Sequence, residues 1–563
     1  MVGKERAIEE ARAGSDGLSQ PLTRRTFVAA ALAAAGALAT DNAVARAAKR
    51  LAPRQIVFLD DTDVDQLHPH DFKTLGAFRV QDALYDRLID WRPYFSASRP
   101  GHYVFNARRY YSRDASRPML LERFSLSPEK TIFRGVLRRG LRFRSGNPVT
   151  AESVRWNFEA MLNGDTVSPT WLGLLRITDS EQVRVVDDRT FEIHLQGPNP
   201  LFWPLFSNDN NAIIDDLVAR RHATAKDPYA DAWLRKHAAG SGPYTVAEWT
   251  PGGDTVLVRR RGYWRPNAVR NDRVVVKSIP DAAQRALLIR GRAADLAQGI
   301  LPRDLADIAT SEPHLRVVSV PIPNAVWMGM NWNTPPFDNI RVRKALLYTI
   351  PYDSLIKKVW HGYAAPMTSV IPSGMPGHTD RYWPYRYDLQ MARRLLSDSG
   401  VKTPVEAVFA VDITQFFHEP TARLIQAEAA KIGIHIRLHR MRGAEFQTRL
   451  YRKEHQLFIY NWHSFANDPF YNFRWLFNAS KACCSVDNFP DHYVDRMTAK
   501  WIYSTDTAGR LRAAAEIQRH LNVERAAWGC LYQPNFTIVM RRNVTGWAYY
   551  GDDLTRYAEL GKA

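Results

Sequence analysis

The sequence predicts an α/β protein that divides into at least two lobes, on two observations. The chain has 563 residues, of which 45% are hydrophobic and 24% charged. That composition is typical of globular proteins and excludes disordered, collagen-like and mainly membrane-embedded chains. Because a single hydrophobic core stops growing near about 250–300 residues, a chain of this length forms more than one core. The second observation is a regular alternation of strand-like and helix-like segments over residues 404–462.

The first 47 residues are predicted to be an export signal. Residues 22–28 read Leu-Thr-Arg-Arg-Thr-Phe-Val, and an alanine-rich apolar stretch of 13 residues runs from Phe27 to Ala39. An arginine pair before such a stretch, with small residues for cleavage after Ala39 or Ala47, is typical of a twin-arginine signal peptide. The stretch is too short to span about 30 Å of hydrocarbon, and no later segment approaches 18 uncharged apolar residues. We therefore expect a periplasmic protein without a transmembrane helix.

Helices are expected where a polar capping residue precedes an apolar stripe of helical period. Thr150, Asp281 and Asp388 are such residues, since their side chains accept hydrogen bonds from the first N–H groups of a helix. The expected helices cover 151–162, 282 to Gly291, and 389–399. Their apolar stripes are predicted to be core rather than functional sites.

Residues 404–462 are predicted to form a parallel sheet with intervening helices. The expected elements are a strand at 405–411, a helix up to Gly433, a strand at 434–439, a helix at 443–452 and a strand at 457–460. Strands joined through helices at this spacing imply right-handed crossovers. Because ligands of open parallel sheets bind beyond the carboxyl ends of the strands, we expect residues 461–465 to lie at a functional rim.

The sequence shows no motif for catalysis or for a cofactor. The patterns GxGxxG, GxxxxGK, GxSxG and HExxH are all missing. The net charge of +18 favours solubility and a weak attraction to anionic surfaces. Basic runs such as residues 259–261 stand outside any nucleic-acid-binding motif. We expect no cofactor and no nucleic-acid partner.

Two histidine pairs are weak metal candidates. His435 and His439 lie on a predicted strand, roughly 13 Å apart at 3.3 Å per residue, which is too far to share an ion. His68 and His70 flank a proline and would need ligands from elsewhere. We expect no protein-held metal.

The three cysteines exclude a disulfide-built scaffold. Cys483 and Cys484 are adjacent, and strain makes a disulfide between neighbours rare. Two alternatives follow: one of these two cysteines forms a disulfide with Cys530, or, as the default, the thiols stay free.

Five further blocks follow one another along the chain. They are Leu120–Phe158, with Leu137-Arg138-Arg139-Gly140 and Pro148 to Val154; Gly240-Ser241-Gly242-Pro243-Tyr244 through Trp249, Gly252 and Tyr263-Trp264; Ile279-Pro280-Asp281 with Leu287, Gly291 and Asp295; Gly329-Met330-Asn331, Pro336-Phe337-Asp338-Asn339 and Arg341 to Ala345; and Gly433 to Pro469. Together they resemble the extracytoplasmic solute-binding proteins of ABC importers, specifically family 5, the dipeptide, oligopeptide and nickel class. The resemblance covers about residues 53–550.

The resemblance implies a two-lobe periplasmic-binding-protein fold, a clamp with an extra subdomain inserted in lobe I. On this chain the signal peptide would be 1–47, lobe I 48–319 with the inserted subdomain, lobe II 320–531, and the return to lobe I 532–563. The crossings would lie near Val320-Pro321 and near Tyr532–Pro534. Because proline fixes φ and restricts the residue before it, these segments would act as stiff, extended straps.

The resemblance also implies where a ligand lies. Asp63, Val64 and Asp65 come just before Leu67–Pro69, which resembles a corner beside the ligand main chain in peptide binders. Their two carboxylates would suit cationic or hydroxylated groups, or they are simply solvated loop acids. Residues 462–469 resemble the cleft segment of lobe II.

Within that segment the chain departs from the family. Peptide binders carry an Asp three residues after the tryptophan that corresponds to Trp462, and it pairs with the peptide ammonium. This chain has Phe465 there. Burying an ammonium without a counter-charge is costly, so the usual anchor is missing. His463, Asn467 or Asp63 could replace the missing aspartate. The departure also favours the family's less common ligands, which include sugars, opines, metal chelates and haem-like compounds.

Trp383 and Tyr385 are further candidates, either as cleft-lining side chains or as surface packing. Their aromatic rings would offer stacking surfaces to a solute.

The predicted function is the periplasmic substrate-binding component of an ABC importer, which delivers a peptide-like or other small organic solute to the permease. The expected partners are that solute and the permease and ATPase subunits, with the protein monomeric and peripheral to the membrane. The alternatives are a secreted enzyme with an unrecognised site and a sensory solute receptor that does not import.

Overall fold

The computed structural model describes residues 54–71, 73–93, 113–208, 211–464, 466–479, 484–489 and 491–563. They belong to one compact unit, Ala52–Ala563. Within these ranges no helix is long and apolar enough to cross a membrane. The predicted signal peptide lies outside the described residues.

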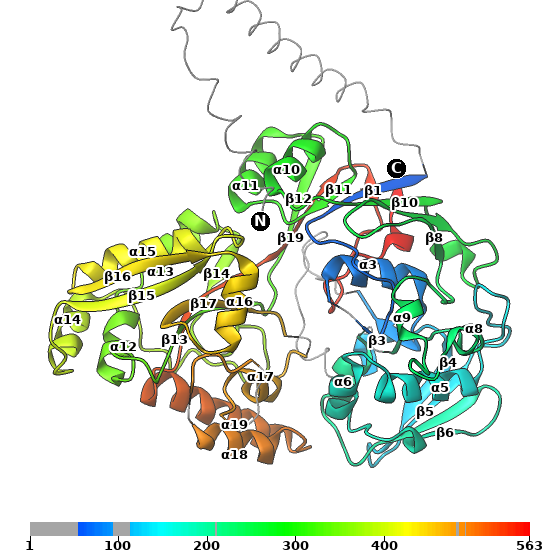
Figure 1. Cartoon of the computed structure of the whole chain (residues 1–563), viewed down its shortest axis with the longest axis horizontal. Coiled ribbons are helices and arrows are strands. Elements are labelled where there is room, and N and C mark those ends of the chain that lie inside the picture. The colour runs from blue at the N-terminus through cyan, green and yellow to red at the C-terminus, as the bar shows by residue number, and fades with distance from the viewer. Residues whose placement is uncertain are drawn as a thin grey trace, which may run out of the picture. The chain divides into compact units, whose positions relative to one another are not determined.

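Lobe I is built on a seven-stranded sheet. Its strands, in spatial order, are β12 (Leu315–Val320), β19 (Phe536–Arg541), β11 (Leu296–Gln298), β1 (Gln55–Asp60), β10 (Arg273–Ser278), β9 (Thr255–Arg259) and β8 (Tyr244–Glu248). β1 pairs in parallel with β10 and β11, whereas the remaining pairs are antiparallel. The sheet therefore contains strands from both ends of the chain (Figure 1).

The helices and small sheets of lobe I complete it. The helices are α3 (Leu75–Leu84), α8 (Asp216–His222), α9 (Asp231–Leu234), α10 (Ala282–Arg290) and α11 (Pro302–Ser311). The two-stranded sheets are β2 (Ile89–Trp91) with β3 (Ser116–Pro118), and β20 (Val544–Thr545) with β21 (Gly561–Lys562).

The inserted subdomain lies between β3 and β8 in the sequence. Its antiparallel sheet has the order β4 (Leu121–Leu126), β5 (Ile132–Leu137), β7 (Thr190–His194) and β6 (Val183–Val185). The helices α5 (Ala151–Asn163), α6 (Ser168–Leu175) and α7 (Phe202–Phe206) pack with it. Thr150 caps α5 by accepting from the Ser153 N–H, as the sequence predicts.

Lobe II is built on a six-stranded sheet. Its order is β14 (Ala364–Pro366), β18 (Gly529–Pro534), β13 (Ala325–Met330), β17 (Leu457–Trp462), β15 (Val405–Asp412) and β16 (Ile434–Met441). Its helices are α12 (Ile340–Leu347), α13 (Tyr352–Ser354), α14 (Leu389–Ser397), α15 (His418–Ala430), α16 (Gly443–Tyr451), α17 (Pro469–Leu476), α18 (His492–Trp501) and α19 (Thr507–Arg519).

The expected parallel sheet is only partly parallel. β15 pairs in parallel with β16 and with β17, and α15 and α16 provide the crossovers as predicted. β17, however, pairs antiparallel with β13. The prediction rested on residues 404–462 alone, and β13 joins the sheet from earlier in the chain.

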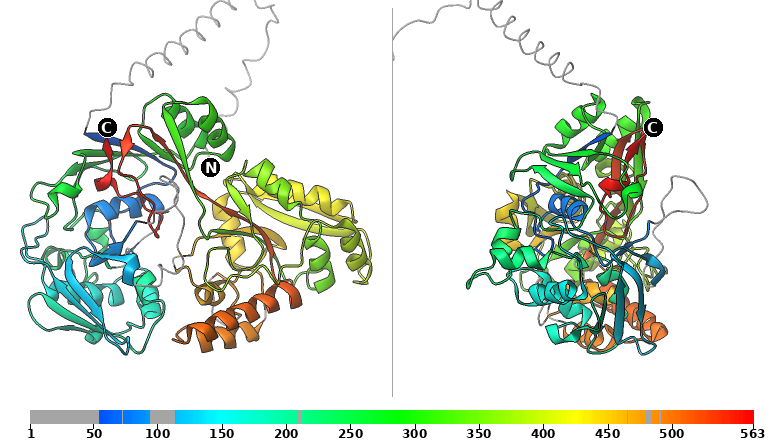
Figure 2. Two further views of the ribbon diagram at one scale, coloured as in Figure 1. Left: turned by 180° about the vertical axis from the view of Figure 1, so that it is seen from behind. Right: turned by 90° about the vertical axis from the view of Figure 1, so that its right-hand side faces the viewer.

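Two segments cross between the lobes. Residues 321–324 join β12 to β13, and Asn535 alone separates β18 from β19. Figure 2 shows from behind that the red C-terminal chain runs without interruption from one lobe into the other. The two crossings are tied together, because Asn535 Nδ2 donates to Ser319 Oγ at 2.9 Å. Both ends of the connection therefore lie in one hinge region.

The buried apolar side chains also join the lobes. One cluster fills lobe I, and another lies between the lobe II sheet and helices α12, α14 and α15. A third contains side chains of both the inserted subdomain and lobe II, among them Phe133, Phe206, Phe470 and Tyr471. The lobes are in contact on the side where the subdomain faces α17.

Candidate functional site

The interlobe cavity has a volume of about 530 Å³. Its lining comes from lobe I, from both crossings, from the C-terminal return and from lobe II. The lining residues are Asp61, Lys73, Thr74, Leu75, Phe78, Asn208, Gln298, Gly299, Asn324, His463, Asn535, Phe536, Thr537, Gly551, Asp552, Asp553 and Leu554. A solute in this cavity touches segments that lie far apart in the sequence.

His463 follows the last residue of β17 and is the lobe II side chain of the lining. Its Nδ1 lies 2.7 Å from Asn324 Oδ1 and 3.3 Å from Asp553 Oδ2. Both neighbours are acceptors, so these distances favour a proton on Nδ1. The sequence predicted this rim position, and His463 links lobe II to the C-terminal return of lobe I.

Asp553 is a buried carboxylate with few donors. Its side chain is 13% exposed, and the Tyr549 hydroxyl donates to Oδ1. Burial raises the pKa of Asp553, while His463 opposes that rise. The backbone at Asp553 has φ of 59°, in the left-handed region that few residues other than glycine adopt. The turn aims this carboxylate at the cavity at some conformational cost.

Asp61 is the second carboxylate of the lining whose negative charge has few favourable partners. Burial and the neighbouring Asp60 raise its pKa, and Arg79 and Arg285 oppose the rise. Its Oδ1 is buried and has no hydrogen-bond partner within the described residues. A Cβ at Gly299 would lie only 2.6 Å from Asp61 Oδ2, and Gly299 has φ of 67°. Glycine is therefore required at this point of the wall.

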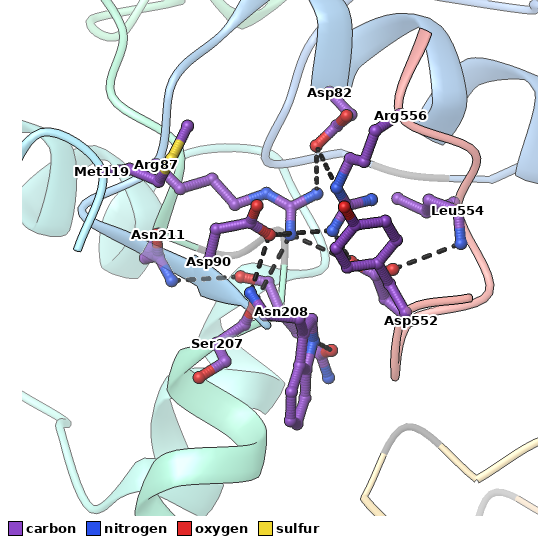
Figure 3. Close-up of polar contacts among 12 residues, drawn as sticks. Asp82, Arg87, Asp90, Met119, Ser207, Asn208, Asn211, Asp552, Leu554 and Arg556 are labelled. Atoms are coloured by element: carbon purple, nitrogen blue, oxygen red, sulfur yellow. Dashed lines mark hydrogen bonds and ion pairs between the residues drawn. The ribbon is translucent and has the colours of Figure 1, made fainter. Parts of the chain in front are cut away.

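Asp552, in contrast, is fully neutralised. Its Oδ2 lies 3.0 Å from Arg87 Nη1 and 2.6 Å from Arg556 Nη2, and all three side chains are at most 7% exposed. Asp82 and Asp90 complete the network around the two guanidinium groups (Figure 3). This buried network fixes the C-terminal return against β2 and α3.

Apart from Lys73, the remaining wall is apolar or neutral. Leu75, Phe78, Phe536 and Leu554 line it beside amide side chains such as Asn208. Asn208 Oδ1 is held in place by the Trp91 Nε1–H at 3.1 Å. Apolar surface with a few placed polar groups is what small-molecule sites offer.

The residues predicted at 63–65 stand behind the wall. Asp63 Oδ2 accepts from the Gly252 N–H at 2.7 Å, and Val64 is fully buried in the lobe I core. Asp65 Oδ1 accepts from Thr74 Oγ1 at 2.9 Å. Thr74 itself lines the cavity, so this loop supports the wall from outside.

Trp462 and Asn467 lie near His463 but belong to lobe II packing. Trp462 Nε1 donates to Asn472 Oδ1 at 3.3 Å, and its ring lies 6.3 Å from that of Tyr471. Asn467 is 4% exposed, directly before the N-cap of α17. Phe465 lies outside the described residues.

Trp383 and Tyr385 line a different cavity, of about 560 Å³, within lobe II. Their rings meet edge to face at 4.9 Å, and the Tyr385 hydroxyl donates to the Asn522 carbonyl at 2.8 Å. The structure therefore does not bring them together with His463.

The histidine pairs have structural partners. His68 Nε2 lies 2.9 Å from Asp231 Oδ1, and His70 Nε2 lies 2.9 Å from the Ala212 carbonyl. Burial lowers the pKa of His70 to about 3. His435 contacts Glu406 on the neighbouring strand. Among the described residues, no group of three or more His, Cys, Asp or Glu side chains is placed to hold a metal.

The structure describes two of the three cysteines, Cys484 and Cys530. Cys530 is a buried free thiol in β18 and is not bonded to Cys484. Cys483 lies outside the described residues.

Sequence reasoning missed Asp61, Asp552 and Asp553. Asp61 directly follows β1, and the two adjacent aspartates follow Gly551 in the C-terminal return. An acidic pair after glycine in the last segment was the available signal. Only the tertiary fold, however, brings residues 61, 463 and 553 to one cavity.

Two curated proteins are similar to this chain. The probable D,D-dipeptide-binding periplasmic protein DdpA of Escherichia coli strain K12 is 26% identical over 73% of this chain and 78% of its own length. The glutathione-binding protein GsiB of Salmonella choleraesuis strain SC-B67 is 27% identical over 59% of this chain and 63% of its own length.

A solved structure has the same fold. The dipeptide-binding protein from Pseudoalteromonas sp. SM9913, in complex with Met-Leu, aligns with a TM-score of 0.76. It covers 90% of this chain and 100% of that protein at 18% identity. The expected two-lobe clamp with a subdomain inserted in lobe I is thus confirmed.

A family model describes most of the chain. The model for bacterial extracellular solute-binding proteins, family 5, middle region, matches residues 116–482. Members of this family bind solutes and are not enzymes. With its two lobes, its inserted subdomain and its interlobe cavity, this chain belongs to the family 5 bacterial extracellular solute-binding proteins.

Proposed function

We propose that this protein is the periplasmic substrate-binding component of an ABC importer, and that it captures a peptide-like or other small organic solute in the interlobe cavity. The observation that carries the proposal is the position of that cavity, at the hinge and between the lobes. Its volume of about 530 Å³ suits a solute of the size of a short peptide.

The clamp explains capture without chemistry. A solute gains contacts with His463 and with the lobe I wall together only when the lobes are closed. It therefore shifts the equilibrium between open and closed forms by its difference in affinity for them. A shift from 1:99 to 99:1 requires about 5.5 kcal/mol of that difference. The solute leaves unchanged when the clamp opens.

Two observations bear on the chemical class of the solute. The similar proteins carry names that refer to D,D-dipeptides and glutathione, both small peptides. Phe465, however, stands where peptide binders of the family carry an aspartate, so the ammonium of a peptide would need another partner. We therefore keep the wider class of peptide-like and other small organic solutes.

The proposed partners are a permease and an ATPase, with the protein peripheral to the membrane and monomeric. The proposed export route is the twin-arginine route, through residues 1–47. We further propose lobe I at 48–319 and 532–563, and lobe II at 320–531. The ends of β12 at Val320 and of β18 at Pro534 support divisions close to these points.

The direct test is native mass spectrometry of the protein taken from its own periplasm. A closed clamp should retain a stoichiometric solute with a mass suited to the cavity. Added back to stripped protein, that solute should raise the melting temperature in a saturable manner and should be recovered chemically unchanged. Turnover of the solute would contradict the proposal, as would the lack of any solute that stabilises the protein.

A further inference from the structure

The charged side chains that line the interlobe cavity differ in how far neighbouring groups neutralise their charge. The lining includes the carboxylates of Asp61, Asp552 and Asp553, together with Lys73 and His463. Asp552 is neutralised by Arg87 and Arg556 inside the wall. Asp61 and Asp553 therefore set the charge that a solute meets.

The cation at the cavity edge contributes little to these two carboxylates. The Lys73 side chain is 61% exposed, and its Nζ lies 3.9 Å from Asp71 Oδ2, outside the cavity lining. An exposed charge is screened by water and ions. Lys73 therefore neutralises little of the negative charge of Asp61 and Asp553.

Asp553 has only a partial counter-charge. Its neighbour His463 is 38% exposed, lies at 3.3 Å and shares its Nδ1 with Asn324 at 2.7 Å. The one Nδ1–H is thus divided between two acceptors, and water screens a contact that is partly exposed. The carboxylate can therefore accept a stronger partner.

The contrast between Asp60 and Asp61 is sharper. Asp60 pairs with the buried Arg79, whose Nη1 lies 2.5 Å and 2.6 Å from its two carboxylate oxygens. Asp61 makes no ion pair within the described residues, and its buried Oδ1 accepts no hydrogen bond there. The nearby Arg285 donates to the carbonyls of Ile279 and Gly299 instead.

A buried carboxylate with few partners is costly, because they replace only part of its lost hydration. A cation that enters the cavity with a solute would remove that cost at both side chains. We propose that the solute carries a cationic group, a primary ammonium or a guanidinium, and that the carboxylates of Asp553 and Asp61 bind it. This inference rests on the proposed function, since it names the chemistry of the same cavity.

The experiment uses four probes that share one dipeptide and differ in the charge of its two ends: Met-Leu, N-acetyl-Met-Leu, Met-Leu amide and N-acetyl-Met-Leu amide. Calorimetry with the mature wild-type protein should give at least tenfold tighter binding for the two probes with a free ammonium. The solute released from native protein should likewise contain a basic nitrogen, by tandem mass spectrometry.

The variants Asp553→Asn and Asp61→Asn keep the side-chain shape and remove the charge. Each should lose the preference for the ammonium probes, while the melting temperature of the empty protein stays equal or rises, because an uncompensated buried charge is gone. The matched control is Asp398→Asn at the end of α14, where the side chain is 56% exposed. It should bind like wild type.

The outcomes separate the two proposals. Equal binding of acetylated and free probes, or a retained solute without a cationic group, would overturn the cation inference and leave the importer function standing. A protein that retains no solute and is stabilised by none of the probes would overturn both.

Discussion

Asp487 is a residue whose burial sets its chemistry. It is fully buried in lobe II, where Oδ2 accepts from the Trp528 Nε1–H and Oδ1 from the Phe489 N–H. Burial raises the pKa of this carboxyl from 3.8 to about 7, although both hydrogen bonds oppose the rise. The folded protein therefore holds a proton that the unfolded chain releases at lower pH.

This predicts a stability that falls as pH rises from about 4 to about 7. In that interval the folded state binds more protons than the unfolded state, so the free energy of unfolding decreases with pH. The slope approaches about 1.4 kcal/mol per pH unit for one proton. Asp487→Asn should remove this part of the slope in urea unfolding experiments, while Asp398→Asn should keep it. Parallel curves for wild type and Asp487→Asn would contradict the assignment.

The lining residues show where sequence reasoning ends at this scale. His463 was predicted, because a residue that follows a strand in an α/β sheet points to the ligand edge. Asp61 and Asp553 were not, because nothing in their neighbouring residues brings the first strand and the C-terminal return together. Trp383 and Tyr385 illustrate the opposite limit, since an aromatic side chain suits a cleft and a core equally well.

At the scale of elements, α17 depends on one carboxylate. Asp468 caps the helix by accepting from the Phe470 N–H at 2.8 Å, and its Oδ2 lies 2.5 Å from Arg510 Nη2. Both side chains are at most 9% exposed. The Arg510 guanidinium also lies 4.7 Å from the centre of the Phe470 ring. Asp468 thus joins the start of α17 to α19.

Asp468→Ala should lower the free energy of unfolding by about 3 kcal/mol or more, because it leaves a buried guanidinium unpaired and removes a cap. Asp468→Asn should cost less, since asparagine also caps helices. The exposed cap of α10 provides the comparison, and Asp281→Ala should cost only about 1 kcal/mol. Urea titrations measure all three, and equal losses for Asp468→Ala and Asp281→Ala would contradict a role for the ion pair with Arg510.

Elements with a local cause were predicted well. The caps at Thr150, Asp281 and Asp388 start α5, α10 and α14, and these helices end within two residues of the expected positions. The mixed character of the lobe II sheet was not predicted. Strand order depends on pairing between distant segments, and β13 and β18 carry no local mark of their neighbours.

For the whole molecule, the contact between the inserted subdomain and lobe II bears on closure. The Trp171 ring of α6 stacks on Tyr471 of α17, with ring centres 6.4 Å apart. Arg176, which caps α6, lies 4.9 Å from the centre of the Tyr503 ring. These contacts join the lobes away from the hinge, so they stabilise the closed form.

Trp171→Ala combined with Arg176→Ala should therefore weaken solute binding by about tenfold to thirtyfold. An aromatic pair and a cation–π contact contribute about 1 kcal/mol each, and 1.4 kcal/mol is a factor of ten. The melting temperature of the empty protein should change little. Calorimetry with the solute retained by wild type measures the loss.

The control for this double variant is Trp233→Ala, where the ring stacks on His222 within lobe I. It should leave the affinity unchanged. Affinity loss of the same size in the control would mean that the subdomain contact has no special part in closure.

The position of β19 has a consequence for how the protein is made. This strand lies between β12 and β11, so β12 is joined to the rest of its sheet only through a segment near the end of the chain. During translation, lobe I lacks an interior strand until all of lobe II has been synthesised. Its maturation is therefore expected to finish after release from the ribosome, and a secretion machinery that accepts finished proteins would suit such a chain.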